Sequence, residues 1–163
     1  MNSWSRLADL AASNFNNVPK SSGIYILRWS KEGKPVSIGR LNDTDDKGIL
    51  YIGSTKILRN RVRKLWKAVN QKPNNHTISK TIIFCKVFDL IGLDEYEITW
   101  EELTKLKDAR GQEWAAIDAY SVKHKEPPPL NLQLNRELFA KLGIAKLPAP
   151  YVYELDDFVK SNL

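Results

Sequence analysis

The spacing of apolar residues along the chain predicts an alternation of helices and strands. Apolar positions recur every three or four residues over 4–15 and 57–69, which is the spacing of one face of an α-helix. Residues 24–29 and 49–52 are short apolar runs bounded by glycine and polar residues, as is typical of strands. We therefore expect two strands that pair as a hairpin through the long polar connection at 30–48, with a helix on either side.

The second half of the chain predicts two more strands and further helices. β-Branched and aromatic residues dominate two short runs, which favours strands. Thr99 and Glu102 have the spacing of a capping box that opens a helix, and Pro127-Pro128-Pro129 stops the helical pattern. In chain order, the expected elements are a strand at 81–88, a strand at 96–100, a helical run interrupted at Gly111 and continued over 112–124, and a short helix at 135–142.

This order of elements predicts an α/β (α+β) sandwich, in which a small, mostly antiparallel three- to four-stranded sheet is flanked by helices. The chain has 163 residues, which fits one domain, and its 42% apolar content is enough for a core. It contains no run of about 18 apolar residues, so we expect no membrane span. The N-terminus lacks a signal-peptide pattern and Cys85 is the only cysteine, so we expect a cytoplasmic protein without a disulfide or a cysteine-rich zinc site.

Charge is distributed unevenly along the chain. The net charge is +6, but residues 47–88 contain ten basic residues and no aspartate or glutamate. The ten are Lys47, Lys56, Arg59, Arg61, Arg63, Lys64, Lys67, Lys72, Lys80 and Lys86. A segment of one sign attracts polyanions and favours a nucleic-acid partner, although a solvated basic helix explains the charge equally well.

Acidic residues gather at 43–46, inside the connection between the first two strands. We expect this cluster to be a solvated hairpin tip, because turn-forming residues surround it. A metal-binding loop is the alternative, but the spacing of the acids matches no calcium-loop pattern.

Five features stand in a fixed order along the chain. Two triplets, Gly23-Ile24-Tyr25 and Tyr51-Ile52-Gly53, coincide with the first two expected strands. Arg61 follows eight residues after the second triplet, Glu113 stands on a predicted helix four residues before an isoleucine, and Asn131 follows the triple proline. With these five features the chain resembles the GIY-YIG nuclease family over 23–131, about two-thirds of its length.

The resemblance implies a divalent-metal-dependent DNA endonuclease that hydrolyses phosphodiester bonds. Its catalytic residues would be Tyr25, Tyr51, Arg61 and Glu113, with Glu113 as the ligand of Mg²⁺ or of Mn²⁺ as a substitute. This chemistry is sound, because a hard cation needs few protein oxygens when substrate phosphate and water complete its shell. Arginine offers a planar, permanently charged donor to phosphate. Tyr25 is the first choice for activating the water, although a phenol with a pKa near 10 needs help at neutral pH.

Further residues take supporting roles by the same resemblance. Gly53 and Asn131 support the site, and Asn131 is expected to tie the end of the helix to the sheet. Lys80, at a spacing that resembles the phage endonuclease II branch, is either a groove residue or an ordinary exposed lysine. His76 stands in a polar loop, where a solvated residue is more typical than a base. The expected nucleic-acid-binding residues are Lys56, Arg59, Arg63, Lys64, Lys67 and Lys72.

The chain departs from the family pattern at three points. The connection between the two tyrosines is longer than is usual in the family. Leu65 stands four residues past Arg61, where many members carry histidine, so a histidine base at that position is excluded. The gap from Glu113 to Asn131 is also long for the family.

We expect a single nuclease domain over 1–163, with a motif core at 20–133 and a C-terminal helix and tail at 134–163. Its partner would be DNA, in double-stranded form, with a homodimer as a further option and no membrane. Restriction, repair and phage-type roles all stay open. Two other functions compete with the nuclease. One is a catalytically inactive nucleic-acid-binding module on a nuclease-like scaffold, and the other is a protein-interaction domain that uses the tail at 151–159.

Overall fold

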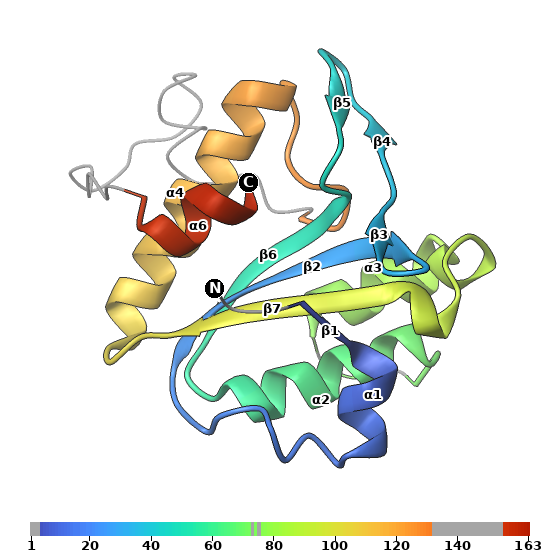
Figure 1. Cartoon of the computed structure of the whole chain (residues 1–163), viewed down its shortest axis with the longest axis vertical. Helices are drawn as coiled ribbons and strands as arrows, with labels where there is room; N and C mark the ends of the chain where they lie inside the picture. Colours follow the sequence, from blue (N-terminus) through green and yellow to red (C-terminus); the bar gives the residue numbers. More distant parts are fainter. Residues whose placement is uncertain (1–3, 73, 75, 132–154) are drawn as a thin grey trace.

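A twisted antiparallel sheet crosses the middle of the molecule, and helices cover both of its faces (Figure 1). The computed structural model describes residues 4–72, 74, 76–131 and 155–163. In chain order the elements are β1 (Ser5–Arg6), α1 (Leu7–Ala12), β2 (Gly23–Lys31), β3 (Lys34–Pro35), β4 (Ile38–Gly39), β5 (Thr44–Asp45), β6 (Ile49–Thr55), α2 (Leu58–Val69), α3 (Thr77–Phe84), the 3-10 helices η1 (Val87–Asp89) and η2 (Leu93–Glu95), β7 (Tyr96–Glu102), α4 (Leu106–His124) and α6 (Asp157–Asn162). The predicted α/β sandwich is confirmed.

Strand β2 is the centre of the sheet. It pairs with β7 along one side and with β6 along the other. The short strand β1 pairs with β7, and the short strand β3 pairs with the end of β2. All of these pairings are antiparallel. The two predicted strands of the hairpin are therefore confirmed, and each is longer than its apolar run.

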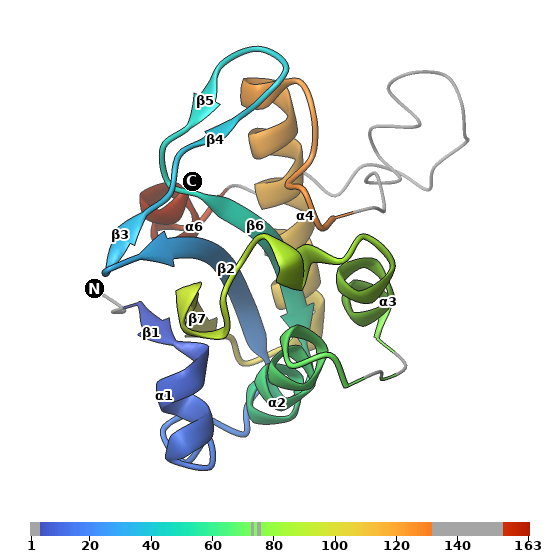
Figure 2. The same ribbon diagram turned by 90° about the vertical axis from the view of Figure 1, so that its right-hand side faces the viewer.

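Alternation along β2 divides the core into two layers. Tyr25 and Leu27 pack into the larger cluster with residues of α1, α2 and α3, whereas Ile24 and Ile26 pack into a second cluster with residues of α4 and α6. Figure 2 shows α2 and α3 side by side on one face of the sheet and α4 on the other. The alternation of side chains along the first half of β2 thus decides which helices each residue meets.

Gly23, the first residue of β2, has no room for a side chain. A Cβ atom there would lie 2.1 Å from the backbone oxygen of Glu101 and 2.9 Å from Cδ1 of Leu58. Gly23→Ala should therefore push β2 away from β7 and lower the free energy of unfolding by about 3 kcal/mol, measured by urea denaturation. Gly39→Ala is the matched control, since no atom lies within 4 Å of a Cβ built there. Equal stability of the two variants would contradict the packing described.

The strand predicted at 81–88 is wrong. Residues 77–84 form helix α3, and the 3-10 helix η1 follows. The side chain of His76 caps the start of α3, and Ile78 and Ile82, one turn apart, are both buried. A short apolar run rich in β-branched residues suits either a strand or a buried helix face, and here packing against α2 favours the helix.

The capping box predicted at Thr99 and Glu102 is also wrong, because both residues belong to β7. Helix α4 begins instead at Leu106 and runs without a break through Gly111, which is buried. Buried packing keeps glycine in the helix in spite of its low helical propensity. Helix α4 ends at His124, and Lys125, which caps it in left-handed conformation, precedes the three prolines.

The N-terminal helix is shorter than the pattern over 4–15 predicts. Ser5 and Arg6 pair with β7, so α1 begins only at Leu7. Asn14 and Phe15 both have left-handed backbone, with φ angles of 51° and 58°, which prevents the helix from continuing to Phe15. Phe15 is nevertheless buried in the larger core cluster.

The C-terminal predictions fall partly outside the described residues. The helix expected at 135–142 lies there entirely, and so does the first half of the tail at 151–159. The last helix, α6, packs on the α4 face of the sheet through Val159. Within the described part of the chain, no helix combines the length and apolarity needed to cross a bilayer.

Candidate active site

Tyr25 and Tyr51 lie side by side on the α2 face of the sheet. Tyr25 pairs with Gly53 across the β2–β6 ladder, and Tyr51 pairs with Leu27. The two rings stack with centroids 6.0 Å apart and an interplanar angle of 29°. Both phenols therefore share one face of the sheet.

Gly53 leaves the space that the two tyrosines occupy. A Cβ atom at this position would lie 2.4 Å from the hydroxyl oxygen of Tyr25 and 2.6 Å from Cε1 of Tyr51. No L side chain fits there without moving a ring. The glycine of the second triplet is therefore a packing requirement of the tyrosine pair.

Burial keeps both phenols protonated. It raises the pKa of Tyr25 well above its ordinary value, and the neighbouring Tyr51 raises it further. Burial and the charge of Glu113 raise the pKa of Tyr51 to about 12. The positive charge of Arg61 acts in the opposite direction on both tyrosines. Both hydroxyls are accordingly neutral donors at pH 7.

Arg61 reaches the tyrosine pair from α2. Its helix packs on the same face as the tyrosines, because Val62 and Leu65 are buried in the larger core cluster. Arg61 itself is half-buried. Its charge affects the pKa of Tyr25, Tyr51, His76 and Glu113, so one guanidinium lies within electrostatic range of all four.

Glu113 reaches the site from α4, on the other side of the sheet. Its Oε2 accepts a hydrogen bond of 2.5 Å from the hydroxyl of Ser54, the residue that follows Gly53 in β6. Burial raises the pKa of the Glu113 carboxyl, while Ser54 and Arg61 partly offset that effect. Sequence reasoning missed Ser54, whose role depends on how α4 lies against β6.

The residues present fit a magnesium ion only if the protein supplies few of its ligands. Among the residues that the structure describes, no three side chains of His, Cys, Asp or Glu gather as a metal cluster. Glu113 is the carboxylate whose charge reaches both tyrosines. Mg²⁺ suits such a position, because it keeps several waters and takes one or two carboxylates together with substrate phosphate.

His76 is half-buried and lies against Tyr51, which differs from the solvated loop residue expected. Its ring meets the ring of Tyr51 edge-on, with centroids 6.5 Å apart and an interplanar angle of 75°. Burial, followed by the charges of Arg61 and Lys64, lowers the pKa of His76 to about 4. The imidazole is therefore neutral at pH 7.

Asn131 has the structural role that was predicted for it. Its Oδ1 accepts the N–H of Ile52 at 2.9 Å, and its Nδ2 donates to the oxygen of Ile52 at 2.8 Å. The neighbouring Leu130 donates its N–H to the oxygen of Leu50 at 2.9 Å. The chain after α4 is thus bonded along the outer edge of β6, the strand that carries Tyr51.

The predicted nucleic-acid-binding residues fall into two groups. Arg59 donates to the backbone oxygens of Val18 and Asn16 at 2.7 and 2.9 Å, and Arg63 donates to Asn14. These arginines tie the loop after α1 to α2. The lysines of the set are all exposed: Lys56, Lys64, Lys67 and Lys72. Lys80 is exposed on α3.

The acidic cluster is a solvated tip only in part, because Asp43 and Asp46 are exposed but Asp45 is not. Asp45 is buried and accepts hydrogen bonds from the N–H groups of Lys47 and Ile49 and from the hydroxyl of Tyr120. Asp43 pairs with His124. A buried carboxylate needs such donors, and they come mostly from the turn itself and from α4, far along the chain.

The hairpin β4–β5 therefore lies against the C-terminal end of α4, as both ribbon views show (Figures 1 and 2). Arg40 forms an ion pair of 3.1 Å with Glu126 and donates to the oxygen of Pro127 at 2.5 Å. Asn42 donates to the oxygen of Lys123 at 3.3 Å. The long connection is thus an ordered addition to the sheet, anchored on α4.

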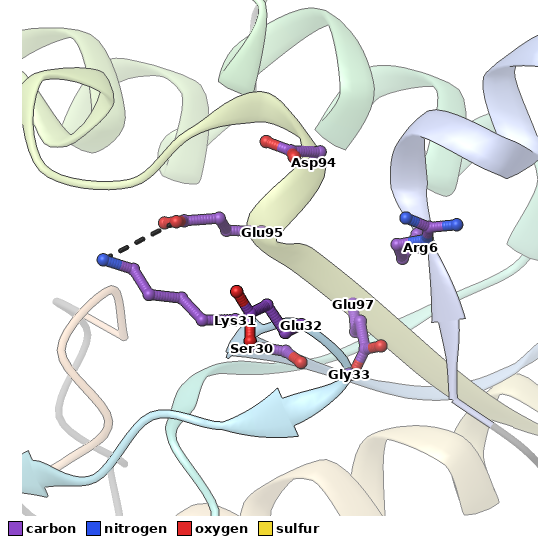
Figure 3. Close-up of a pocket in the computed structure, with 8 residues that line it drawn as sticks. All are labelled: Arg6, Ser30, Lys31, Glu32, Gly33, Asp94, Glu95 and Glu97. Atoms are coloured by element: carbon purple, nitrogen blue, oxygen red, sulfur yellow. Dashed lines mark ion pairs between the residues drawn. The ribbon is translucent and has the colours of Figure 1, made fainter.

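An acidic cavity of about 660 Å³ lies at the opposite end of β2 from Tyr25 (Figure 3). Its lining residues are Arg6, Ser30, Lys31, Glu32, Gly33, Asp94, Glu95 and Glu97. Lys31 pairs with Glu95 at 3.6 Å, and Glu97 pairs with Arg28. Its excess of carboxylates makes this cavity unsuitable for DNA.

Comparison of the chain with protein-family models, with curated proteins and with solved structures gave no match. The family resemblance rests on the chain's own residues. Of these, Tyr25, Tyr51, Arg61 and Glu113 interact with one another, and His76 joins them. The site is therefore built from β2, β6, α2, α4 and the residue before α3.

Proposed function

We propose that the protein is a divalent-metal-dependent endonuclease that hydrolyses phosphodiester bonds in double-stranded DNA. The observation that carries the proposal is the mutual influence of Tyr25, Tyr51, Arg61 and Glu113, which come from four different elements. A buried phenol pair, a guanidinium and a carboxylate form a costly arrangement for a purely structural core. They match the needs of a reaction that attacks a phosphate with water.

Arg61 would bind the scissile phosphate. Its planar fork matches two phosphate oxygens, and it stays charged at any physiological pH. Glu113 would hold the magnesium ion together with a DNA phosphate. When bound, the ion would stabilise the negative charge that develops on the phosphate during attack.

Tyr25 would orient the attacking water. Its hydroxyl is buried and has no hydrogen-bond partner in the described part of the chain. A buried hydroxyl without a partner gains most from a water or a phosphate oxygen that enters the site. Because burial raises the pKa of Tyr25, the phenol would hold the water as a neutral group.

The lysines around α2 would bind the DNA backbone. Lys56, Lys64, Lys67 and Lys72 are all exposed in the segment that contains no acid. Binding that relies on neutralising DNA phosphates weakens as the salt concentration rises, because it is driven by the release of counterions from the DNA. DNA binding by this protein should therefore be strongly salt-dependent.

The direct test is cleavage of supercoiled plasmid by the purified chain. We expect nicked or linear products in Mg²⁺ or Mn²⁺, and no products when EDTA removes the metal. Products that form equally well in EDTA would overturn the metal requirement. Salt-dependent DNA binding without cleavage in either metal would favour the competing function, an inactive nucleic-acid-binding module.

A further inference from the structure

His76 is held in one orientation from two directions. Its Nδ1 accepts the N–H of Ile78 at 3.3 Å, which caps helix α3, and its own backbone N–H donates to Oδ1 of Asn74 at 3.0 Å. Its ring stands edge-on against Tyr51. The imidazole is therefore fixed relative to the tyrosine pair and is not free to rotate as a loop side chain would be.

The capping bond determines which ring nitrogen carries the proton. A nitrogen that accepts a hydrogen bond has no proton, so the neutral ring carries its single proton on Nε2. The charges of Arg61 and Lys64, together with burial, keep the ring neutral at pH 7 by lowering the pKa of His76. In this state Nε2–H is a donor, and neither nitrogen is free to act as a base.

A neutral donor at this position complements the charges around it. Arg61 supplies a fixed positive charge near Tyr51, and a protonated imidazole at His76 would be repelled by it. An uncharged N–H group avoids that repulsion and still stabilises negative charge on an oxygen. The oxygen that enters this part of the site during the proposed reaction belongs to the DNA phosphate.

We propose that His76 is a catalytic hydrogen-bond donor, whose Nε2–H contacts a non-bridging oxygen of the scissile phosphate beside Tyr51. This role rests on the proposed nuclease function and adds a residue to its machinery. It also separates two functions of one side chain: Nδ1 stabilises α3, and Nε2 serves the reaction.

Two substitutions separate these functions. His76→Asn places an acceptor near the position of Nδ1 and keeps the cap, but it has no donor near the position of Nε2. His76→Gln places an amide donor near the position of Nε2, but it has no acceptor near the position of Nδ1 and so loses the cap on α3. We expect His76→Asn to keep its melting temperature and to lose about 100-fold in kcat with little change in KM. We expect His76→Gln to melt about 2–4 °C lower and to keep kcat within about tenfold of the unmodified chain.

A higher kcat for His76→Asn than for His76→Gln would overturn the proposal, because it would mean that only the cap on α3 matters. Unchanged kcat in both variants would overturn it as well, while plasmid cleavage by the unmodified chain would still support the nuclease. Nitrogen-15 NMR of the histidine rings in the full chain gives a readout that is independent of cleavage. A proton on Nε2 of His76 is expected, and a proton on Nδ1 would refute the donor role even if DNA were cut.

Discussion

Arg61→Ala should lower kcat for DNA cleavage by about 10²–10³-fold, because it removes a fixed positive charge from the site where negative charge develops. No other side chain described at the site carries a permanent positive charge within range of Tyr25, Tyr51 and Glu113 together. Arg61→Lys should recover only part of the rate, since an ammonium lacks the planar fork that fits two phosphate oxygens. Single-turnover cleavage of a labelled duplex measures both variants.

Lys67→Ala is the matched control for Arg61→Ala. Lys67 is exposed on the same helix, so the substitution removes the same charge from α2 and leaves the tyrosine pair intact. It should weaken DNA binding and leave kcat nearly unchanged. The slope of the logarithm of the binding constant against the logarithm of the salt concentration should fall by about one. Equal losses of kcat in the two variants would contradict a specific role of Arg61 in the chemical step.

Arg61→Ala has a second consequence that does not depend on activity. Arg61 is one of the charges that hold the pKa of His76 at about 4. Without it, the pKa of His76 should rise toward its ordinary value, and an NMR titration of the ring would show the change. An unchanged His76 pKa would contradict the proximity of the two side chains.

Glu113→Gln should abolish Mg²⁺-dependent cleavage, with a loss of about 10³-fold in rate. The amide keeps the size of the side chain and an oxygen that accepts the hydrogen bond of Ser54, so the fold should be retained. What is lost is the negative charge that a divalent cation needs. Raising the Mg²⁺ concentration should not restore the rate.

Asp108→Asn is the control for Glu113→Gln. Asp108 lies in the first turn of the same helix, and its loss removes one carboxylate from α4 outside the set of interacting site residues. Its cleavage rate and its dependence on Mg²⁺ should match those of the unmodified chain. If Glu113→Gln cleaved DNA at the rate of the unmodified chain, Glu113 would not be the metal ligand, and the proposed metal site would be refuted.

Much of the sheet could be predicted because its signals are local. The apolar runs that became β2 and β6 are bounded by glycine and polar residues, and antiparallel pairing with a period of two places Tyr25 and Tyr51 on one face. Helix α2 has a periodic apolar face that matches its buried side. These features need no knowledge of distant parts of the chain.

The errors arise where distant contacts decide the structure. The run at 81–88 has β-branched residues, yet the cap at His76 and the burial of Ile78 and Ile82 make its first part a helix. The burial of Asp45 depends in part on Tyr120, 75 residues further along the chain. No local pattern encodes such a partner.

The candidate site divides in the same way. Arg61 and Glu113 were identified from residue types in a known order, which sequence alone supplies. Ser54 was missed because its contact depends on how α4 meets β6. The capping role of His76 was missed because no helix was predicted to begin there. The residues proposed to act in the reaction are thus visible in the sequence, whereas Ser54 and the contacts of His76 are visible only in the fold.

Gly53 creates a conflict between the stability of a strand and the geometry of a site. Glycine inside a strand costs about 0.5–1 kcal/mol relative to alanine, so a residue with a side chain would make β6 more stable on its own. The volume that such a side chain would fill is already taken by the phenol of Tyr25. Selection for thermal stability at this position would therefore act against the tyrosine pair, and engineering for heat resistance should leave it unchanged.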